Sequence, residues 1–400
     1  MKDPEKTNTK VLHLARWYPN RYDPMPGLFI QRHVEAANKY SDVGVVYTHI
    51  VEEEKIKGIY ELEESVINGV PTAKVYYSNP KSQIPLISQL IKAFRFYKAN
   101  FLGIKKIKQQ LGSFDLVHVH ILTRLGVIAL YYKWFCNKPF IITEHWSRYL
   151  DLTGSFTGGL RKATTKLIVR NASVVTTVTQ NLANAMQKHG LKNKDYRVLA
   201  NVVDAPFFNP GTSYEKDSGK KLITHVSCFE DKSKNVSGLL RVILSLSKKR
   251  SDFIFHLIGD GMDFKSLHNY SIDLGLEDTV VIFTGLLEEK ELVSEMAAAD
   301  LMVVFSNYEN FPVVINESFV LGIPVVATSV GGIPEYVNES NGRLLNAGDE
   351  VALEDYLSDF LDAKLSFDKQ KIRSDSVAVF SPETIGKELF NMYRTIKAEH

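Results

Sequence analysis

The chain has 400 residues, of which 44% are hydrophobic, 24% charged and 11% aromatic. This length predicts two domains, and this composition excludes collagen-like, disulfide-scaffold and wholly disordered chains. The net charge of +2 conceals a basic half, residues 1–200, with 29 Lys and Arg against 15 Asp and Glu, and an acidic half with 19 against 31. Such a basic half suggests an anionic partner, namely a lipid headgroup, nucleic acid or phosphorylated substrate, unless the two halves neutralise each other.

Short apolar runs rich in β-branched residues alternate with helical patterns along the whole chain. The predicted strands are 11–15, 43–50, 73–77, 116–121, 140–144 and 174–178, then 222–227, 253–258, 280–283, 301–305 and 324–327. This alternation is typical of parallel βαβ units, so we expect two doubly wound α/β domains with ligands in a cleft beyond the carboxyl ends of the strands. A linker rich in Pro, Gly and Ser is predicted at 205–221, and a last helix begins at Pro382 with Ser381 as its N-cap.

Several common sites are excluded by their missing residues. No P-loop and no Asp-x-Asp motif occurs, and Gly259-Asp260-Gly261 lacks the third glycine of a dinucleotide fingerprint. Cys136 and Cys228 lie far apart without neighbouring metal ligands, which fits a reducing compartment. The start of the chain is polar, and the apolar stretch 125–136 is too short to span a bilayer, so a cytoplasmic protein is predicted.

The segment from Ser306 to Glu339 is the most informative. After a strand comes a polar loop with Glu309, then Pro312 at the predicted first position of a helix that Gly322 ends. Glu317 lies about a turn and a half into that helix. The helix N-terminus offers free N–H groups and a partial positive charge to an anion.

These motifs together resemble the retaining glycosyltransferase family 4 (glycosyl transferases group 1). The resemblance lies in Glu309 and Glu317 spaced eight apart, with Asn310-Phe311-Pro312 between them and Gly331-Gly332-Ile333-Pro334-Glu335 after them. It continues through residues 17–19, 26–29, 143–147, 201–204, 234–235, 259–261 and 380–393. It implies the GT-B fold, in which two Rossmann-like domains face a cleft. We therefore expect an acceptor domain at 1–205, completed by a returning helix at 381–400, and a nucleotide-sugar donor domain at 206–380.

The resemblance also implies residue roles. The expected catalytic residues are His145, Lys234 and Glu309, and the expected donor-binding residues are Gly27, Lys232, Gly261, Leu286, Asn310, Phe311, Pro312 and Glu317. Lys234 and helix N-termini would stabilise the leaving diphosphate without a metal ion or other cofactor. Glu309 would hold the transferred sugar, Glu317 the ribose and the backbone near Leu286 the base, while His145 would face the sugar. The family is thought to react by front-face attack, so no carboxylate nucleophile is needed.

One position departs from the family's pattern, and two histidines are expected to pack rather than to react. The family usually has an arginine six residues before Lys234, where this chain has Cys228, which we expect to be small and buried. Our hypothesis is that Lys232 compensates for the missing guanidinium. His118 and His120 alternate on one strand and therefore share a face, where packing is expected rather than catalysis.

The segment 83–111 combines an apolar stripe with a basic one. Leu86, Leu90, Phe94, Tyr97 and Phe101 recur at helical spacing, and six Lys and Arg occur without any acidic residue. Such a helix lies on an anionic membrane surface, or else packs on its own sheet with a solvated basic face.

The resemblance predicts transfer of a hexosyl or N-acetylhexosaminyl group, with retention, from a UDP- or GDP-sugar to a glycan or polyprenyl-linked acceptor in bacterial surface polysaccharide biosynthesis. The alternatives are a sugar-nucleotide epimerase of GT-B shape and a non-catalytic sugar-nucleotide-binding protein. Nucleic acid is not an expected partner, because no basic groove with stacking aromatics is evident. The expected location is the cytoplasm, with peripheral contact at the inner face of the plasma membrane.

Overall fold

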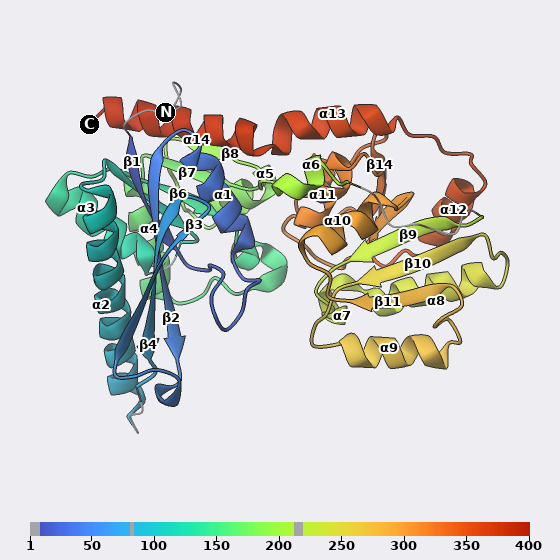
Figure 1. Ribbon diagram of the computed structural model, residues 1–400, viewed down its shortest axis with the longest axis horizontal. Coiled ribbons are helices and arrows are strands. Elements are labelled where there is room, and N and C mark those ends of the chain that lie inside the picture. The colour runs from blue at the N-terminus through green and yellow to red at the C-terminus, as the bar shows by residue number, and fades with distance from the viewer. Residues whose placement is uncertain (1–8, 81–83, 123, 212–218) are drawn as a thin grey trace. The chain divides into compact units, whose positions relative to one another are not determined.

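The computed structural model describes residues 9–80, 84–122, 124–211 and 219–400 (Figure 1). The chain divides into two compact units: unit 1 is formed by residues 1–202 and 382–400, and unit 2 by residues 203–381. Each unit is built on its own sheet, with its own hydrophobic core. All eleven predicted strands are present, and the two-domain α/β architecture is confirmed.

Unit 1 contains an eight-stranded sheet in the order β3-β4-β2-β1-β5-β6-β7-β8. Its strands are β1 Lys10–Ala15, β2 Asp42–Val51, β3 Tyr60–Ile67, β4 Val70–Ser78, β5 Leu116–His120, β6 Phe140–Glu144, β7 Val174–Thr177 and β8 Tyr196–Val198. Every neighbouring pair is parallel except β3 and β4. That antiparallel hairpin was not predicted, although its turn, Asn68-Gly69, has the positive φ angles that Asn-Gly hairpin turns adopt.

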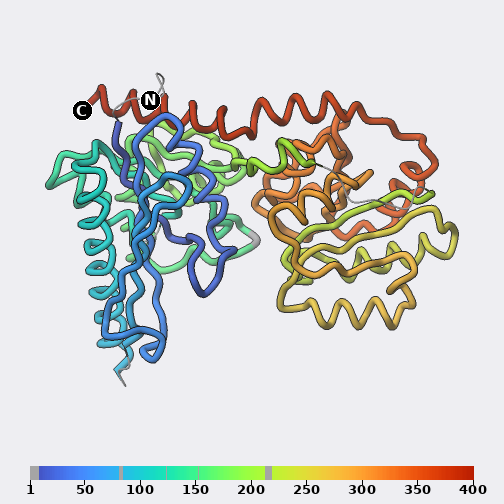
Figure 2. The backbone as a smooth tube through the Cα atoms, viewed as in Figure 1, coloured from blue at the N-terminus to red at the C-terminus, as the bar shows by residue number. Residues whose placement is uncertain are grey.

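The helices of unit 1 cover both faces of this sheet. They are α1 Leu28–Asn38, α2 Pro85–Leu111, α3 Leu125–Cys136, α4 Gly159–Asn171, α5 Gln180–Lys188 and α14 Pro382–Ala398, with short 3-10 helices η1 Glu53–Lys55, η2 Ser147–Tyr149 and η3 Asp151–Thr153. Helices α2, α3 and α4 share one core with Leu12 and Leu14 of β1. Helices α1 and α14 pack on each other, and Tyr393 of α14 meets His118 of β5. The C-terminal end of the chain thus belongs to unit 1, as its return beside the blue N-terminal segments shows (Figure 2).

Unit 2 contains a six-stranded parallel sheet in the order β11-β10-β9-β12-β13-β14. Its strands are β9 Lys221–Val226, β10 Phe253–Ile258, β11 Val281–Gly285, β12 Leu301–Val304, β13 Val325–Thr328 and β14 Gly342–Leu345. The chain runs outward from β9 on one side and from β12 on the other. The topological switch point, where such sheets bind ligands, therefore lies between β9 and β12.

The helices of unit 2 are α6 Ala205–Phe208, α7 Asp231–Lys234, α8 Val236–Ser247, α9 Phe264–Asp273, α10 Glu289–Ala297, α11 Val313–Val320, α12 Glu350–Leu361 and α13 Lys369–Phe380, with the 3-10 helix η4 Ile333–Glu335. Short helix α6 opens the predicted linker, and residues 212–218 of that linker lie outside the described residues. In the part of the chain that the structure describes, no helix has the length and apolar character needed to cross a membrane.

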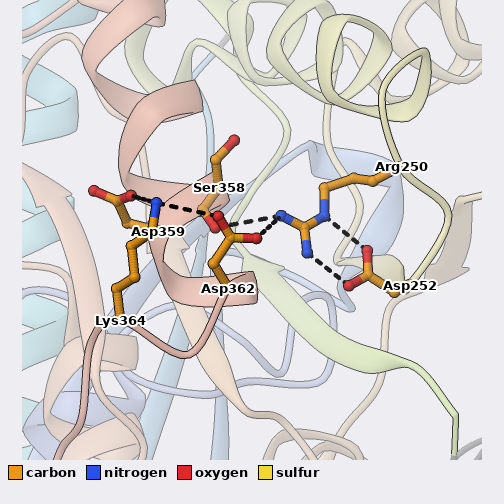
Figure 3. A network of polar contacts seen from close by, with 6 residues as sticks. All are labelled: Arg250, Asp252, Ser358, Asp359, Asp362 and Lys364. Carbon is orange, nitrogen blue, oxygen red and sulfur yellow. Dashed lines mark hydrogen bonds and ion pairs between the residues drawn. The ribbon is translucent and has the colours of Figure 1, made fainter.

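A polar network fixes the C-terminal end of α12 to the turn before β10 (Figure 3). The Arg250 guanidinium donates two hydrogen bonds of 2.7 Å to the Asp252 carboxylate and one of 2.8 Å to Asp362. Lys364 joins Asp362 to Asp359, at 3.2 and 2.9 Å. The bidentate Arg250–Asp252 pair adds orientation as well as charge to this corner of unit 2.

Candidate functional site

The loops after β9 and β12 meet at the switch point of unit 2. The backbone N–H of Asn307 donates to the carbonyl of Ser233 at 2.8 Å, and the Asn307 side chain donates to the carbonyl of Lys232 at 3.1 Å. Two segments some 75 residues apart in the chain are therefore joined at the carboxyl edge of the sheet. Lys234 ends the short helix α7 in the first of these connections, and Glu309 lies in the second.

Lys234 and Glu309 form an ion pair with each other. The Lys234 ammonium donates to Glu309 Oε1, and the Ser306 hydroxyl donates to the same oxygen at 3.1 Å. Both side chains are shielded, with 14% and 11% of their surface exposed. Desolvation by burial works to lower the pKa of Lys234, but the charge and hydrogen bond of Glu309 outweigh it, so that the pKa is raised. The two residues expected to hold the diphosphate and the sugar thus neutralise each other.

The Glu309 loop rests on the glycine pair at residues 331 and 332. A Cβ on Gly331 would lie 2.0 Å from the Glu309 carbonyl oxygen, and Gly331 has a φ of +58°. The N–H of Gly332 donates to the Asn310 carbonyl at 2.7 Å. Gly331 is therefore explained by a close backbone approach that leaves no room for a side chain, and Gly332 joins the same loop through its N–H.

Helix α11 begins one residue later than predicted. Pro312 is the N-cap, with φ −72° and ψ +125°, and the first helical residue is Val313. Phe311 is buried against the ring of Tyr336, with 4.5 Å between their centroids. Glu317, the expected ribose ligand, is only 4% exposed and so lies inside the unit.

The neighbouring Asn316 is a residue that the sequence analysis missed. It is fully buried, and neither polar atom of its amide has a hydrogen-bond partner in the described chain. A buried amide without partners costs roughly 1–3 kcal/mol, which makes it a feature that needs a reason. The only sequence signal for it was its place beside Glu317.

Gly259 and Gly261 hold the loop after β10 against the loop after β9. A Cβ on Gly259 would lie 1.9 Å from the Ser227 carbonyl oxygen, and one on Gly261 would lie 2.5 Å from the Phe229 nitrogen. These glycines are required by backbone packing within unit 2. Leu286 follows β11 at the same edge of the sheet and is 50% exposed.

Cys228 is exposed, so the prediction that it is buried was wrong. It precedes Phe229, which fills the core of unit 2, and the side chain at 228 therefore points away from that core. Its thiol is close enough to Lys234 to contribute to raising the pKa of that lysine. Lys232, the residue expected to compensate, is exposed in the same loop.

In unit 1, His145 directly follows β6 and is buried. Its ring contacts those of Phe29 and His33, with centroid distances of 4.7 and 5.3 Å. Desolvation by burial, followed by the charge of His33, holds the pKa of His145 well below 6.5, so the ring is neutral. The carboxylate of Glu144 accepts hydrogen bonds from the N–H groups of Leu122, His145 and Trp146, which fixes this strand end.

Gly27 precedes α1 and has a φ of +83°. A Cβ there would lie 2.4 Å from the carbonyl of Trp17, so the glycine is needed where the loop after β1 passes beneath it. The structure thus gives Gly27 a packing function within unit 1. Its expected approach to the donor stays a prediction.

Three buried histidines form a cluster on the α1/α14 face of the unit 1 sheet. His13 Nδ1 lies 2.9 Å from His120 Nε2, and the two nitrogens of His118 lie 2.7 Å from the Tyr393 hydroxyl and 2.6 Å from that of Thr143. Desolvation by burial, then the charge of His33, lowers the pKa of His13 to about 3. Both nitrogens of His118 have protein partners, whereas His13 Nε2 and His120 Nδ1 are buried without a hydrogen-bond partner among the described residues.

Two family models match the chain. Residues 212–374 match the model described as "Glycosyl transferases group 1", and residues 68–206 match "Glycosyltransferase Family 4". The N-acetyl-alpha-D-glucosaminyl L-malate synthase of Bacillus anthracis is 27% identical over 62% of this chain and 65% of its own length. The chain thus spans just under two thirds of that relative. The putative teichuronic acid biosynthesis glycosyltransferase TuaC of Bacillus subtilis is 23% identical over 98% of this chain and 97% of its own.

Among solved structures, Anabaena Alr3699/HepE in complex with UDP superposes with a TM-score of 0.70. The match covers 97% of this chain and all of the other, with 20% identical residues. At that identity the likeness establishes the fold.

Proposed function

We propose a specific reaction for this chain, which belongs to glycosyltransferase family 4, has the GT-B fold and is therefore a glycosyltransferase. The reaction moves a hexosyl or N-acetylhexosaminyl group, with retention, from a nucleotide-sugar to a glycan or polyprenyl-linked acceptor. Its proposed setting is bacterial surface polysaccharide biosynthesis. The observation that carries the proposal is the shielded Lys234–Glu309 pair at the switch point of unit 2. A relative named as a putative teichuronic acid biosynthesis glycosyltransferase supports the surface polysaccharide assignment, and a neighbour solved with UDP supports a uridine donor.

The pair accounts for both halves of the donor. When a nucleoside diphosphate leaves, negative charge grows on its phosphate while the sugar becomes positive. Lys234, released from Glu309, would stabilise the first charge, and Glu309 would accept hydrogen bonds from the sugar hydroxyls. We propose that these residues and the N-terminus of α11 carry the transfer without a metal ion. We further propose that Glu317 binds the ribose and that His145 of unit 1 contacts the sugar.

The first test is turnover with a panel of UDP- and GDP-sugars and acceptors, with UDP and GDP binding measured by calorimetry. We expect product only with acceptor present, unchanged activity in EDTA and loss of activity in Glu309→Ala. The matched control is Glu350→Ala, which removes the exposed Arg241–Glu350 pair of the same unit. Donor turnover without acceptor would indicate an epimerase, and binding without turnover a non-catalytic protein.

The role of Lys232 is separable from that of Lys234. If Lys232 replaces the arginine that the family usually has at Cys228, Lys232→Ala weakens UDP binding by about tenfold, the worth of one charge-assisted hydrogen bond. Lys234→Ala is expected to abolish both UDP binding and turnover. Unchanged affinity in Lys232→Ala would reject the compensation.

We also propose that unit 1 docks on the inner face of an anionic plasma membrane through segment 83–111 and the two helices beside it. Helices α2, α3 and α4 carry eleven Lys and Arg and no acidic residue. Large apolar side chains lie exposed among them, at Leu86, Leu90, Phe94, Phe101, Val127, Tyr131, Trp134, Phe135, Leu160 and Leu167. Phe101 of α2 touches Tyr131 of α3, with 5.6 Å between their ring centroids. We call these exposed apolar and basic side chains of α2, α3 and α4 the helical face.

The exposure of the apolar stripe favours docking over packing on the chain's own sheet. Leu90 and Phe94 are 62% and 66% exposed, whereas α2 meets the sheet with a different set of residues, among them Phe96 and Ile104. Some of the cations have protein partners: Lys106 pairs with Glu64 at 3.0 Å, and Arg95 donates to Ser78. The exposed cations of α4 add to those left on α2. Apolar insertion and attraction to anionic lipid would act together on such a surface.

Sedimentation with vesicles tests the docking. We expect binding to phosphatidylglycerol-containing vesicles and little to neutral ones, with Trp134→Ser and Phe135→Ser together weakening it about tenfold or more. Neutralising Lys105, Lys106 and Lys108 should weaken it further, since each cation near such a surface is worth about 1 kcal/mol. Lys192→Gln, an exposed lysine of unit 1 outside the helical face, is the control. Equal binding of all variants would reject the helical face.

A further inference from the structure

Three arginines follow three adjacent strands at the carboxyl edge of the unit 1 sheet. Arg16 follows β1, Arg124 comes in the loop after β5, and Arg148 comes after β6 in η2. The order β2-β1-β5-β6 makes β1 and β5 the two sides of the switch point, where an open α/β sheet binds its ligand. We call Arg16, Arg124 and Arg148 the arginine edge.

Backbone and ring contacts hold these loops together. The N–H of Arg16 donates to the carbonyl of His120 at 3.3 Å, which joins the end of β1 to the end of β5. The guanidinium of Arg148 lies 3.4 Å from the centre of the Trp146 ring, and that ring lies 5.2 Å from the ring of Trp17, the residue after Arg16. The arginines are thus held on a scaffold of strand ends and tryptophans.

The positive charge of this edge is poorly compensated. Within residues 9–80, 84–122 and 124–202, none of the three arginines makes an ion pair, and the Nε of Arg148 is buried without a hydrogen-bond partner. Desolvation by burial lowers the pKa of Arg148, and Arg161 and Arg16 lower it further. An anion bound beside Arg148 would stabilise its positive charge and give its unpaired Nε a hydrogen-bond acceptor.

The acidic groups at this edge are few. Glu144 attracts Arg148, but its carboxylate is buried and already accepts three backbone hydrogen bonds. Asp23 is exposed, and its charge raises the pKa of Tyr47 and His49 while the charge of Arg16 lowers both. The charges of Arg16 and Arg124 both lower the pKa of the Tyr77 hydroxyl near the end of β4, which desolvation by burial raises. These two carboxylates leave an excess of positive charge.

We infer that the arginine edge binds an oxyanion, a phosphate or carboxylate, carried by the acceptor substrate. This inference rests on the proposed function, in which unit 1 receives the acceptor. Planar guanidinium groups match the geometry of a carboxylate or phosphate and bind it with paired hydrogen bonds. A neutral glycan alone would leave the partly buried Arg148, whose Nε has no hydrogen-bond partner, beside the positive charge of Arg16, so the acceptor is of the anionic class.

Tryptophan fluorescence offers a local readout. The chain has three tryptophans, and in a Trp134→Phe background the remaining two, Trp17 and Trp146, both lie at the arginine edge. The protein is first saturated with UDP so that unit 2 is occupied, and inorganic phosphate is then titrated at constant ionic strength. We expect a saturable change in fluorescence that Arg148→Gln weakens at least tenfold and Arg148→Lys weakens less. Arg16→Gln should act as Arg148→Gln does, and Lys192→Gln should have no effect.

The outcomes separate this inference from the proposed function. An equal response in wild type, Arg148→Gln and Arg16→Gln, or a response that UDP abolishes, overturns the anion site. A phosphate response together with no binding of UDP or GDP keeps the anion site and rejects the donor. A membrane headgroup as the source is tested with phosphatidylglycerol vesicles: if they elicit the response and soluble phosphate does not, the oxyanion belongs to lipid and the acceptor assignment is wrong.

Discussion

Replacing Glu309 by Gln separates the binding of the diphosphate from the transfer of the sugar. Lys234 donates to Glu309, so a diphosphate that binds Lys234, as we propose, would compete with that carboxylate for the ammonium group. Gln keeps the shape of the side chain and an acceptor oxygen but removes the negative charge. The substitution therefore frees Lys234 for phosphate while weakening the contact proposed for the sugar.

The magnitudes follow from the burial of the pair. A hydrogen bond to a charged group contributes about 1.5–3 kcal/mol, and the two side chains are 14% and 11% exposed, so solvent screens the pair only weakly. We expect Glu309→Gln to lower the free energy of unfolding of unit 2 by about 1–2 kcal/mol, since Lys234 keeps a neutral acceptor. UDP affinity should rise about tenfold, the equivalent of about 1.4 kcal/mol. Turnover should fall about 10²–10³-fold, the usual loss for one preorganised polar group in a transition state.

The assay is UDP calorimetry and single-turnover transfer measured on the same preparations, with urea unfolding as the stability readout. Glu350→Gln serves as the control, because its partner Arg241 lies on the exposed surface and both measures should stay at the wild-type value. The reasoning is refuted if Glu309→Gln weakens UDP binding and turnover together. That result would mean that Glu309 positions Lys234 for the phosphate and does not compete for it.

Three further changes test other parts of the structure. Gly331→Ala should lower activity more than tenfold and the free energy of unfolding by about 1–3 kcal/mol, because a Cβ there meets a close backbone neighbour. The control is Gly348→Ala, where φ is +75° but nothing lies within 4 Å, so it should cost only its backbone strain. Activity assays and urea unfolding measure both. Burial lowers the pKa values of His13 and His33 to about 3 and about 4, so between pH 6.5 and pH 4 the unfolded chain binds protons that the native chain does not. The free energy of unfolding should therefore fall, as the pH is lowered through this range, by up to about 1.4 kcal/mol per pH unit for each histidine. Equal unfolding curves at pH 7.5 and pH 5 would contradict this. Arg250→Met should lower the stability of unit 2 by about 1 kcal/mol without changing UDP affinity, and a change in affinity would show that the network reaches the site.

The strands of the fold were predictable because parallel strands buried on both faces are continuous apolar runs. Val43–Ile50 and Phe140–Glu144 are such runs, and both are strands. Strand β3, by contrast, carries Glu61, Glu63 and Glu64 and forms the edge of the sheet, so its pattern is that of a solvated segment. Short edge strands β8 and β14 were missed for the same reason.

The residues of the candidate site could be selected from the sequence, whereas their burial and orientation could not. The spacing of Glu309 and Glu317 is visible in the sequence, yet their burial is not, because it depends on parts of unit 2 that are distant in the chain, such as Lys234 beside Glu309. Cys228 illustrates the same limit. A lone cysteine is usually buried, but here Phe229 takes the inward position and the thiol faces out. The side that a loop residue faces is decided by its neighbours in space.

The opposite net charges of the two halves can be assigned to particular surfaces of the units. In unit 1 much of the positive charge falls on two surfaces: the helical face, on α2, α3 and α4, and the arginine edge, which follows the ends of strands β1, β5 and β6. The half that contains unit 2 is acidic, so a diphosphate approaching it meets an unfavourable average field. In the proposed function Lys234 would overcome that field because it is shielded from water, where a single charge acts at lower dielectric. Raising the ionic strength should therefore weaken anion binding at unit 1 more than UDP binding at unit 2, because salt screens exposed charges more than buried ones. Equal salt dependence of the two would show that bulk charge, and not the buried lysine, draws the donor.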